Sequence, residues 1–207
     1  MTQGSSNPTG ERVRGWGYYV GFDEPLEPCM PAYHEFDVSL VGVKPRIRRR
    51  FVLRATATFA DLHRAIQDAC GWQDRHLFAF RDRTDSPLAG IPDKETDEPD
   101  PDARRVRLSS YFGEGKETTC MYEYDFGDAW EHEVTLRAAI KLPDRFERRL
   151  LGGARAFPPE DCGGLPGYEA CVRMATQGRG PKDLREWLGD WDPEAFDLEE
   201  TRREFDR

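Results

Sequence analysis

Alternating apolar and polar residues predict an antiparallel hairpin near the start of the chain. Residues 33–41 (YHEFDVSLV) and 46–54 (RIRRRFVLR) both alternate with a period of two, and turn residues separate them. This period is typical of strands with one buried face. Pairing residues whose numbers sum to 87 places Phe36 opposite Phe51 and Asp37 opposite Arg50, so both faces match. Arg49 is the exception, because its register points the side chain inward.

The segment after this hairpin predicts a helix over residues 58–70. Thr58 is a suitable N-cap, Asp61 lies three residues later as in a capping box, and Gly71 is a typical stop. Apolar residues at helical spacing form one stripe, which can pack on the inner face of the hairpin. Residues 76–80 (HLFAF) favour a short strand after the helix.

A second hairpin follows a long loop. Residues 82–105 contain many acids and several prolines, which predicts an exposed loop. Residues 119–126 and 130–138 then predict two strands joined by a Gly-Asp-Ala turn. Pairing residues whose numbers sum to 256 places Tyr124 opposite His132 and gives a mostly apolar inner face.

The same register places acidic residues opposite one another on the outer face of the second hairpin. Glu123 lies opposite Glu133, and Asp125 lies opposite Glu131. Like charges in directly opposed positions destabilise a strand pair. Arginines of the first hairpin compensate if both hairpins share a sheet, and the alternative is a bound cation.

The C-terminal third is helical, and the order of elements indicates an α+β fold. Apolar residues fit helices near 168–175, after Pro181 and over 198–205, and Asp192-Pro193 is typical of a helix start. We expect a mainly antiparallel sheet of two hairpins plus a short strand, packed on a helix in a β-grasp-like arrangement and followed by C-terminal helices. Structural roles are expected for Thr58, Asp61, Gly71, Trp72, Gly127, Trp130, Gly163 and Gly164.

Composition narrows the class of protein. Among the 207 residues, no apolar run approaches the roughly 18 residues of a membrane span, and no signal-peptide pattern begins the chain. Five widely spaced cysteines argue against a disulfide framework and favour a cytoplasmic protein with free thiols. We predict one domain over residues 33–207 after a flexible extension, residues 1–32.

Acidic and histidine residues gather around the second hairpin and a later loop rich in proline and glycine. Asp and His side chains together suit zinc, manganese or iron, so a divalent metal is an open alternative. Against it, the register points His132 inward and Asp125 outward, which favours a buried histidine and turn-capping acids without a cofactor. The candidate cluster consists of His76, Asp125, Asp128, His132, Glu160 and Asp161.

The basic segment of the first hairpin has two interpretations. Phosphate binding by its arginines would make a nucleic-acid interface. Pairing with the neighbouring acidic strand leaves no free positive charge, and the formal net charge of −9 favours this interpretation. The candidate nucleic-acid or partner-binding residues are Arg46, Arg48, Arg50 and Arg54.

Several motifs occur in one order along the chain. They lie at residues 43–51, 58–63, 71–72 with 76–77, 124–132, 158–168 and 192–196. Together they resemble the plasmid pRiA4b ORF-3-like family, whose members are also labelled insertion-element passenger or TnpR-like proteins. The resemblance covers about residues 33–206 and implies a compact α+β domain linked to mobile elements, with no established activity. Arg48 and Phe157 depart from the family pattern, in which Trp and Cys are expected.

These observations predict a non-enzymatic binding or accessory module with an unknown protein partner. No phosphate-cradling loop, nucleophile elbow or zinc-protease motif occurs in the sequence. Resolvase activity is not expected, because no serine from residue 33 onward lies in the setting of an activated nucleophile amid arginines, and Tyr122 and Tyr124 lack a basic His/Arg cluster in the sequence. Two alternatives stay open: a metal-dependent hydrolase or nuclease at the Asp/His cluster, and nucleic-acid binding through the basic strand. A membrane partner is not expected.

Overall fold

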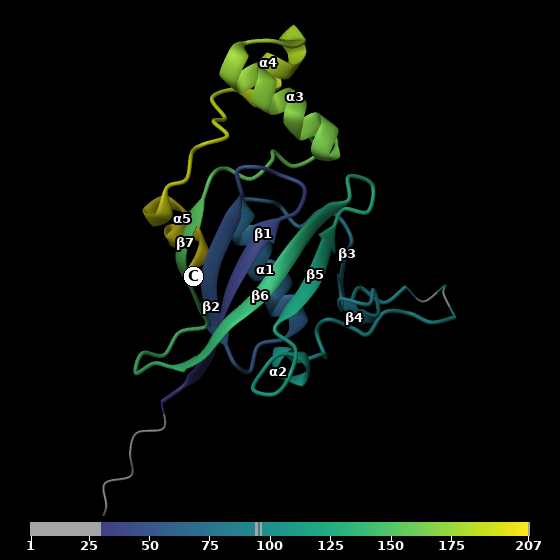
Figure 1. The fold of residues 1–207 in the computed structure, drawn as a ribbon, viewed down its shortest axis with the longest axis vertical. Helices are drawn as coiled ribbons and strands as arrows, with labels where there is room; N and C mark the ends of the chain where they lie inside the picture. The colour runs from purple at the N-terminus through teal and green to yellow at the C-terminus, as the bar shows by residue number, and fades with distance from the viewer. Residues whose placement is uncertain (1–29, 94, 96, 207) are drawn as a thin grey trace, which may run out of the picture.

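The structure, a computed structural model, describes residues 30–93, 95 and 97–206. This part of the chain forms a seven-stranded antiparallel sheet in the order β4-β3-β5-β6-β1-β2-β7. Figure 1 shows α1 across one face of the sheet, α5 beside β7, and α3 and α4 projecting from one end. The predicted α+β class, with a sheet packed on a helix and C-terminal helices, is confirmed. The elements are β1 (Ala32–Leu40), β2 (Arg48–Arg54), α1 (Phe59–Cys70), β3 (Phe78–Arg81), β4 (Pro87–Gly90), α2 (Leu108–Tyr111), β5 (Thr119–Tyr124), β6 (Trp130–Lys141), β7 (Arg148–Ala154), α3 (Gly164–Gln177), α4 (Lys182–Leu188) and α5 (Leu198–Phe205).

The first hairpin has the predicted register. β1 and β2 pair Phe36 with Phe51 and Asp37 with Arg50, and both phenylalanines are fully buried. β1 also pairs with β6, so the two hairpins share one sheet. The apolar faces of both hairpins therefore form one continuous inner surface, on which α1 packs.

Arg49 points inward, as its position in the strand predicts. Its Nε donates to the carbonyl of Ala69 at 2.7 Å, and its Nη1 donates to the carbonyl of Arg155 at 2.9 Å. The guanidinium also lies 4.8 Å from the centre of the Phe157 ring. Main-chain oxygens and an aromatic face thus stabilise this buried cation.

α1 begins and ends where the sequence predicts. Asp61 N donates to the Thr58 hydroxyl at 3.2 Å, and the Asp61 carboxylate accepts the Thr58 amide at 2.8 Å, which completes a capping box. Gly71 ends the helix in the left-handed conformation, with φ +78°. Directly after it, Trp72 Nε1 donates to the carbonyl of Pro158 at 2.9 Å, which ties the end of α1 to the segment before α3.

The second hairpin has a different register from the predicted one. Tyr124 pairs with Trp130 and Tyr122 pairs with His132, so paired numbers sum to 254 and the predicted sum of 256 is wrong. The reason is a five-residue turn in place of three, in which Asp125 (φ +56°) and Ala129 (φ +52°) adopt left-handed conformations. The Ala129 amide closes this turn on the Asp125 carbonyl at 2.7 Å.

The outer face of the second hairpin changes with the register. Glu123 lies opposite Glu131, and the predicted pairs of Glu123 with Glu133 and of Asp125 with Glu131 are wrong. Burial, with the nearby Glu131 charge, raises the pKa of Glu123. Glu133 instead bonds Arg46 at 3.1 Å, which is the compensation by the first hairpin that the sequence predicts.

Three local predictions for the rest of the chain are wrong. The predicted loop over residues 82–105 contains the edge strand β4, which is only four residues long and shows no alternation. β7 on the opposite edge is missed because its sequence, RRLLGGA, combines adjacent apolar residues with two glycines. No helix begins at Asp192-Pro193; α5 begins later, where the Asp197 side chain accepts the Glu200 amide at 2.9 Å.

Most of the predicted N-terminal extension, residues 1–32, falls outside the described residues, and β1 begins at Ala32. Across residues 30–206, apart from positions 94 and 96, the structure contains no helix with the length and apolarity that crossing a lipid bilayer requires.

Candidate functional site

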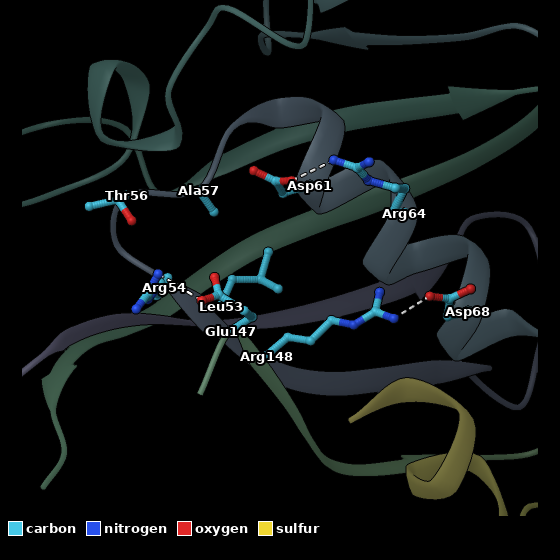
Figure 2. A pocket seen from close by; sticks show the side chains of 9 residues that line it. All are labelled: Leu53, Arg54, Thr56, Ala57, Asp61, Arg64, Asp68, Glu147 and Arg148. Carbon is cyan, nitrogen blue, oxygen red and sulfur yellow. Dashed lines mark hydrogen bonds and ion pairs between the residues drawn. The ribbon is translucent and has the colours of Figure 1, made fainter. Parts of the chain in front are cut away.

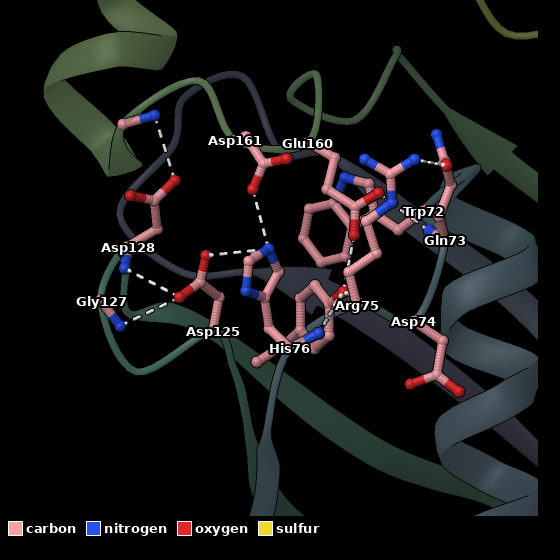
Figure 3. Close-up of polar contacts among 12 residues, drawn as sticks. Trp72, Gln73, Asp74, Arg75, His76, Asp125, Gly127, Asp128, Glu160 and Asp161 are labelled. Atoms are coloured by element: carbon pink, nitrogen blue, oxygen red, sulfur yellow. Dashed lines mark hydrogen bonds and ion pairs between the residues drawn. The ribbon is translucent and has the colours of Figure 1, made fainter.

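Three segments that are far apart in the sequence meet at one end of the sheet (Figure 3). They are the segment before β3, the β5–β6 turn, and the loop before α3. Asp128 of the turn accepts the Gly163 amide of the loop at 3.0 Å through Oδ2. A Cβ atom added to Gly164 would lie 2.8 Å from the Asp128 carbonyl oxygen, so the loop lies directly against the turn. Main-chain contacts therefore position the acidic side chains of both segments.

One histidine and two aspartates converge where these segments meet. His76 Nε2 lies 2.7 Å from Asp161 Oδ1 and 3.6 Å from Asp125 Oδ2, and one ligand atom from each residue lies within 4.8 Å of the others. The side chains of His76, Asp125 and Asp161 are 31%, 15% and 51% exposed, respectively. The cluster is thus accessible to solvent on the Asp161 side and more enclosed on the Asp125 side.

The Asp125 carboxylate is oriented by its own turn. Its Oδ1 accepts the amides of Gly127 at 3.0 Å and Asp128 at 3.4 Å. The left-handed conformation of Asp125 is uncommon for a residue with a side chain, although Asp tolerates it better than most. These contacts leave Oδ2 directed toward His76 (Figure 3).

Tyr124 connects the end of β5 to the other two segments. Its hydroxyl donates to Glu160 Oε1 at 2.6 Å and accepts the amide of Arg75 at 2.9 Å. Glu160 Oε2 in turn accepts the Gln73 amide at 3.0 Å. Burial, with the hydrogen bond to Glu160, raises the pKa of Tyr124, so its hydroxyl stays protonated and able to donate. Glu160 therefore holds the main chain beside His76 and is occupied by these contacts.

The electrostatics of the cluster favour a bound cation. The hydrogen bond to Asp161 is the main cause that raises the pKa of His76, and the Asp125 charge acts in the same direction. A positive charge on the imidazole and a metal ion at Nε2 are alternative ways to neutralise the two carboxylates. In tetrahedral or octahedral sites with bonds of about 2.0–2.1 Å, neighbouring ligand atoms lie roughly 2.8–3.4 Å apart. The two distances from His76 Nε2, 2.7 Å and 3.6 Å, bracket this range, so small shifts of the side chains would give the three residues the spacing of ligands of a divalent ion.

The other three members of the predicted cluster do not join these three side chains. Asp128 and Glu160 are engaged with main-chain amides and Tyr124, as described above. His132 is fully buried, and its Nδ1 lies 3.0 Å from the Trp130 carbonyl oxygen. Burial lowers the pKa of His132 to about 4, so this histidine is neutral in the folded protein at pH 7. His132 therefore belongs to the core, on the inner face that its register predicts.

Cys162 lies next to Asp161 in the loop, but its thiol is not activated. Burial is the main cause that raises its pKa to about 12, so the nucleophilic thiolate is scarce at neutral pH.

Each of the four candidate binding arginines of the basic segment has a carboxylate partner. Arg46 pairs with Glu133 at 3.1 Å, as described above. The shortest distances in the other three pairs are 3.3 Å for Arg48–Asp37, 2.5 Å for Arg50–Glu35 and 2.7 Å for Arg54–Glu147. This geometry corresponds to the intramolecular pairing that the net charge favours.

A cavity of about 420 Å³ lies between α1 and the start of β7, and paired charged side chains line it (Figure 2). The three arginines that line it each contact an acidic residue of the same wall. These pairs are Arg54–Glu147 at 2.7 Å, Arg64–Asp61 at 2.6 Å and Arg148–Asp68 at 2.5 Å. The cavity thus offers a charged ligand no unpaired arginine.

Sequence reasoning missed a buried polar network on α1. His63 Nδ1 lies 2.8 Å from the Tyr122 hydroxyl, and His63 Nε2 lies 2.7 Å from Asp74 Oδ1. Because Gln67 donates to the same hydroxyl at 3.0 Å, Tyr122 donates to His63 and His63 donates to Asp74. The available signal was the spacing of His63 and Gln67, which places both on the apolar stripe of the helix. Burial lowers the pKa of His63, and both ring nitrogens are occupied, so the network is structural.

Comparisons with known proteins give a family but no activity. The family model described as "Plasmid pRiA4b ORF-3-like protein" matches residues 32–200. The uncharacterized protein y4hQ of Sinorhizobium fredii (strain NBRC 101917 / NGR234) is 34% identical over 173 residues, which cover 82% of this chain and 88% of that protein. The crystal structure of MM3350, a protein of unknown function from Methanosarcina mazei Go1, is similar with a TM-score of 0.72 and 33% identity, over 82% of this chain and 96% of that one.

Proposed function

Because the chain belongs to the plasmid pRiA4b ORF-3-like family, whose relatives above are uncharacterized or of unknown function, we propose a function from its own residues: His76, Asp125 and Asp161 bind one divalent metal ion. The observation that carries this proposal is the convergence of one imidazole nitrogen and two carboxylate oxygens, from three separate segments, within 4.8 Å. Mixed nitrogen and oxygen ligands suit zinc, manganese or iron.

Hydrolysis is the reaction that such a centre supports best. Three protein ligands leave coordination positions open, as in catalytic zinc sites. A bound divalent ion supplies a Lewis acid and lowers the pKa of its water ligand. The chain supplies the geometry: the turn amides fix Asp125, Tyr124 holds the main chain before His76, and the exposed side of Asp161 is open to water.

A non-enzymatic binding or accessory module with a protein partner is the second proposal. The exposed apolar side chains of Leu77, Ile91 and Phe126, which line one cavity with His76 and Asp125, favour it, because a group of exposed apolar side chains marks an interaction site. Turnover of ester and phosphodiester substrates by the metal-loaded protein would support the hydrolase, and metal binding without turnover would support the module. The link to mobile elements and the cytoplasmic location stay predictions, as does nucleic-acid binding through the basic strand.

Metal titration of tag-free protein, stripped with a chelator, tests the metal site. We expect one equivalent of Zn²⁺ or Mn²⁺ to bind by calorimetry, and His76→Gln and Asp125→Asn each to weaken binding about 100-fold. Asn tolerates the left-handed conformation at position 125 and keeps an oxygen for the turn amides, so the fold is retained. Asp85→Asn is the matched control, because Asp85 also has a positive φ but lies outside the cluster. Binding by Asp125→Asn that equals the wild type would contradict the proposal.

The hydroxyl of Tyr124 gives a second prediction about the same centre. Tyr124→Phe removes the contacts to Glu160 and to the Arg75 amide but leaves the three metal ligands in place. We expect about a tenfold loss of Zn²⁺ affinity in calorimetry, because supporting contacts of this kind orient metal ligands. Tyr111→Phe removes a comparable hydroxyl, which donates to the Thr119 carbonyl at 2.9 Å, and should leave the affinity unchanged. Equal losses in both variants would assign the effect to general stability.

A further inference from the structure

Three large apolar side chains line the cavity beside the metal cluster. Leu77, Ile91 and Phe126 are 54%, 48% and 50% exposed, respectively. They line a cavity of about 630 Å³ that His76 and Asp125 also line. Each comes from a different segment: the residue before β3, the loop after β4 and the β5–β6 turn.

This grouping is unusual for the surface described by the structure. Seven large apolar residues are exposed among the described residues, and three of them share this one cavity. Isolated exposed apolar residues are common, whereas a group of them marks a binding site. The cavity volume is within the range of small-molecule sites, roughly 300–1,000 Å³.

The cavity is mixed in chemistry. The lining combines the three apolar side chains with four polar residues, Asp74, Arg75, His76 and Asp125. Asp74 is already engaged by His63 at 2.7 Å. A divalent ion at the cluster would present positive charge to the ligand, which fits an oxygen-rich, electron-rich head group.

A second cavity of about 300 Å³ extends the space for an apolar group. Asp74 and Ile91 line both cavities, so the two adjoin. Its lining includes Ala60, Phe78 and Pro92 beside four more polar side chains, those of His63, Arg64, Asp102 and Arg104. A chain that begins at the metal cluster and crosses Ile91 thus has room to continue past these apolar groups.

Building on the proposed metal site, we propose that the ligand of this centre is an acyl compound with a large apolar group. Its carboxylate or carbonyl oxygens bind the metal held by His76, Asp125 and Asp161. Its apolar group packs on Leu77, Ile91 and Phe126. Removing these side chains from water supplies binding energy that a short, polar acyl compound cannot gain.

Hydroxamates of two chain lengths test this proposal, because both bind metal through the same two oxygens. Acetohydroxamate and octanohydroxamate are titrated into the Zn²⁺-loaded protein. We expect octanohydroxamate to bind at least tenfold more tightly. Ile91→Ser and Phe126→Ser should reduce this ratio severalfold, while Zn²⁺ affinity stays at the wild-type value. Trp187→Ser is the matched control, because Trp187 is 52% exposed on α4 and does not line the cavity, so it should keep the wild-type ratio.

The outcomes separate this inference from the metal site. If the protein binds one equivalent of Zn²⁺ but binds both hydroxamates with equal affinity, the apolar acyl ligand is overturned, whereas the metal site is supported. If octanohydroxamate binds equally well without Zn²⁺, the proposal that one ligand contacts both the metal and the apolar side chains is overturned. Dimerisation that Ile91→Ser and Phe126→Ser abolish assigns these apolar side chains to a protein interface and also overturns it. Failure to bind Zn²⁺ at all contradicts the proposed function itself.

Discussion

Lowering the pH from 7 to below 4 is expected to remove about 3 kcal/mol from the free energy of unfolding through His132 alone. Burial lowers the pKa of this histidine to about 4, whereas an unfolded chain has a value near 6.5. Above pH 6.5 the ring is neutral in both states, so the folded protein has its full stability. Between pH 6.5 and pH 4 the unfolded chain binds a proton that the folded state does not, and stability falls. Each pKa unit corresponds to about 1.4 kcal/mol, which gives the stated loss.

Comparing variants isolates the contribution of His132. Burial also lowers the pKa of His34 and His63, so these residues add losses of the same sign, whereas the raised pKa of His76 acts in the opposite direction. His132→Phe removes the titrating group and keeps a ring that can stack on Phe157. His132→Asn removes it too and keeps a donor for the Trp130 carbonyl.

Urea unfolding at several pH values measures the effect. Both variants should lose about 3 kcal/mol less stability than the wild type over this pH interval. An NMR titration should also place the His132 transition near pH 4. If the free energy of unfolding falls equally with pH in the wild type and in both variants, His132 takes up its proton at the same pH in the folded and unfolded states, which would contradict this prediction.

The sequence predicts which strand faces are buried better than it predicts which residues pair. In the second hairpin the predicted and observed registers differ by two positions. A shift of two keeps every side chain on the same face, so the apolar pattern is equally satisfied by both registers. Tyr122, Tyr124 and His132 are therefore buried as predicted, although their partners are different. The turn decides the register, and the left-handed conformation of Ala129 has no signature in its residue type.

For the candidate site, the sequence likewise predicts the kinds of residue better than it predicts which of them meet. His76, Asp125 and Asp161 were all in the cluster named from the sequence, because imidazole and carboxylate groups are recognisable as metal ligands. Which of the six members converge depends on contacts between segments that are 35 residues apart or more, such as Gly163 with Asp128. Local periodicity carries no information about these contacts. It does place His132 on the inner face, and the structure has it in the core.

The packing of α3 against the loop before it explains how Asp161 is held. A Cβ atom on Gly167 would lie 1.7 Å from the Cys162 carbonyl oxygen, which is far inside van der Waals contact. The atom it meets belongs to the main chain, so no side-chain rotation can relieve the overlap. The loop that carries Glu160 and Asp161 must then move away from the first turn of the helix.

Gly167→Ala is therefore expected to lower the free energy of unfolding by about 3 kcal/mol and to weaken Zn²⁺ binding about tenfold. The stability loss follows from forced displacement of main chain, and the affinity loss follows from displacement of Asp161. Gly152→Ala is the matched control, because a Cβ atom at Gly152 in β7 meets nothing within 4 Å, and its effect should stay within about 0.5 kcal/mol. Urea unfolding and metal calorimetry on both variants measure the two effects. A Gly167→Ala protein as stable as Gly152→Ala would contradict this close packing, whereas a loss of stability with unchanged Zn²⁺ affinity would show that Asp161 is held independently of α3.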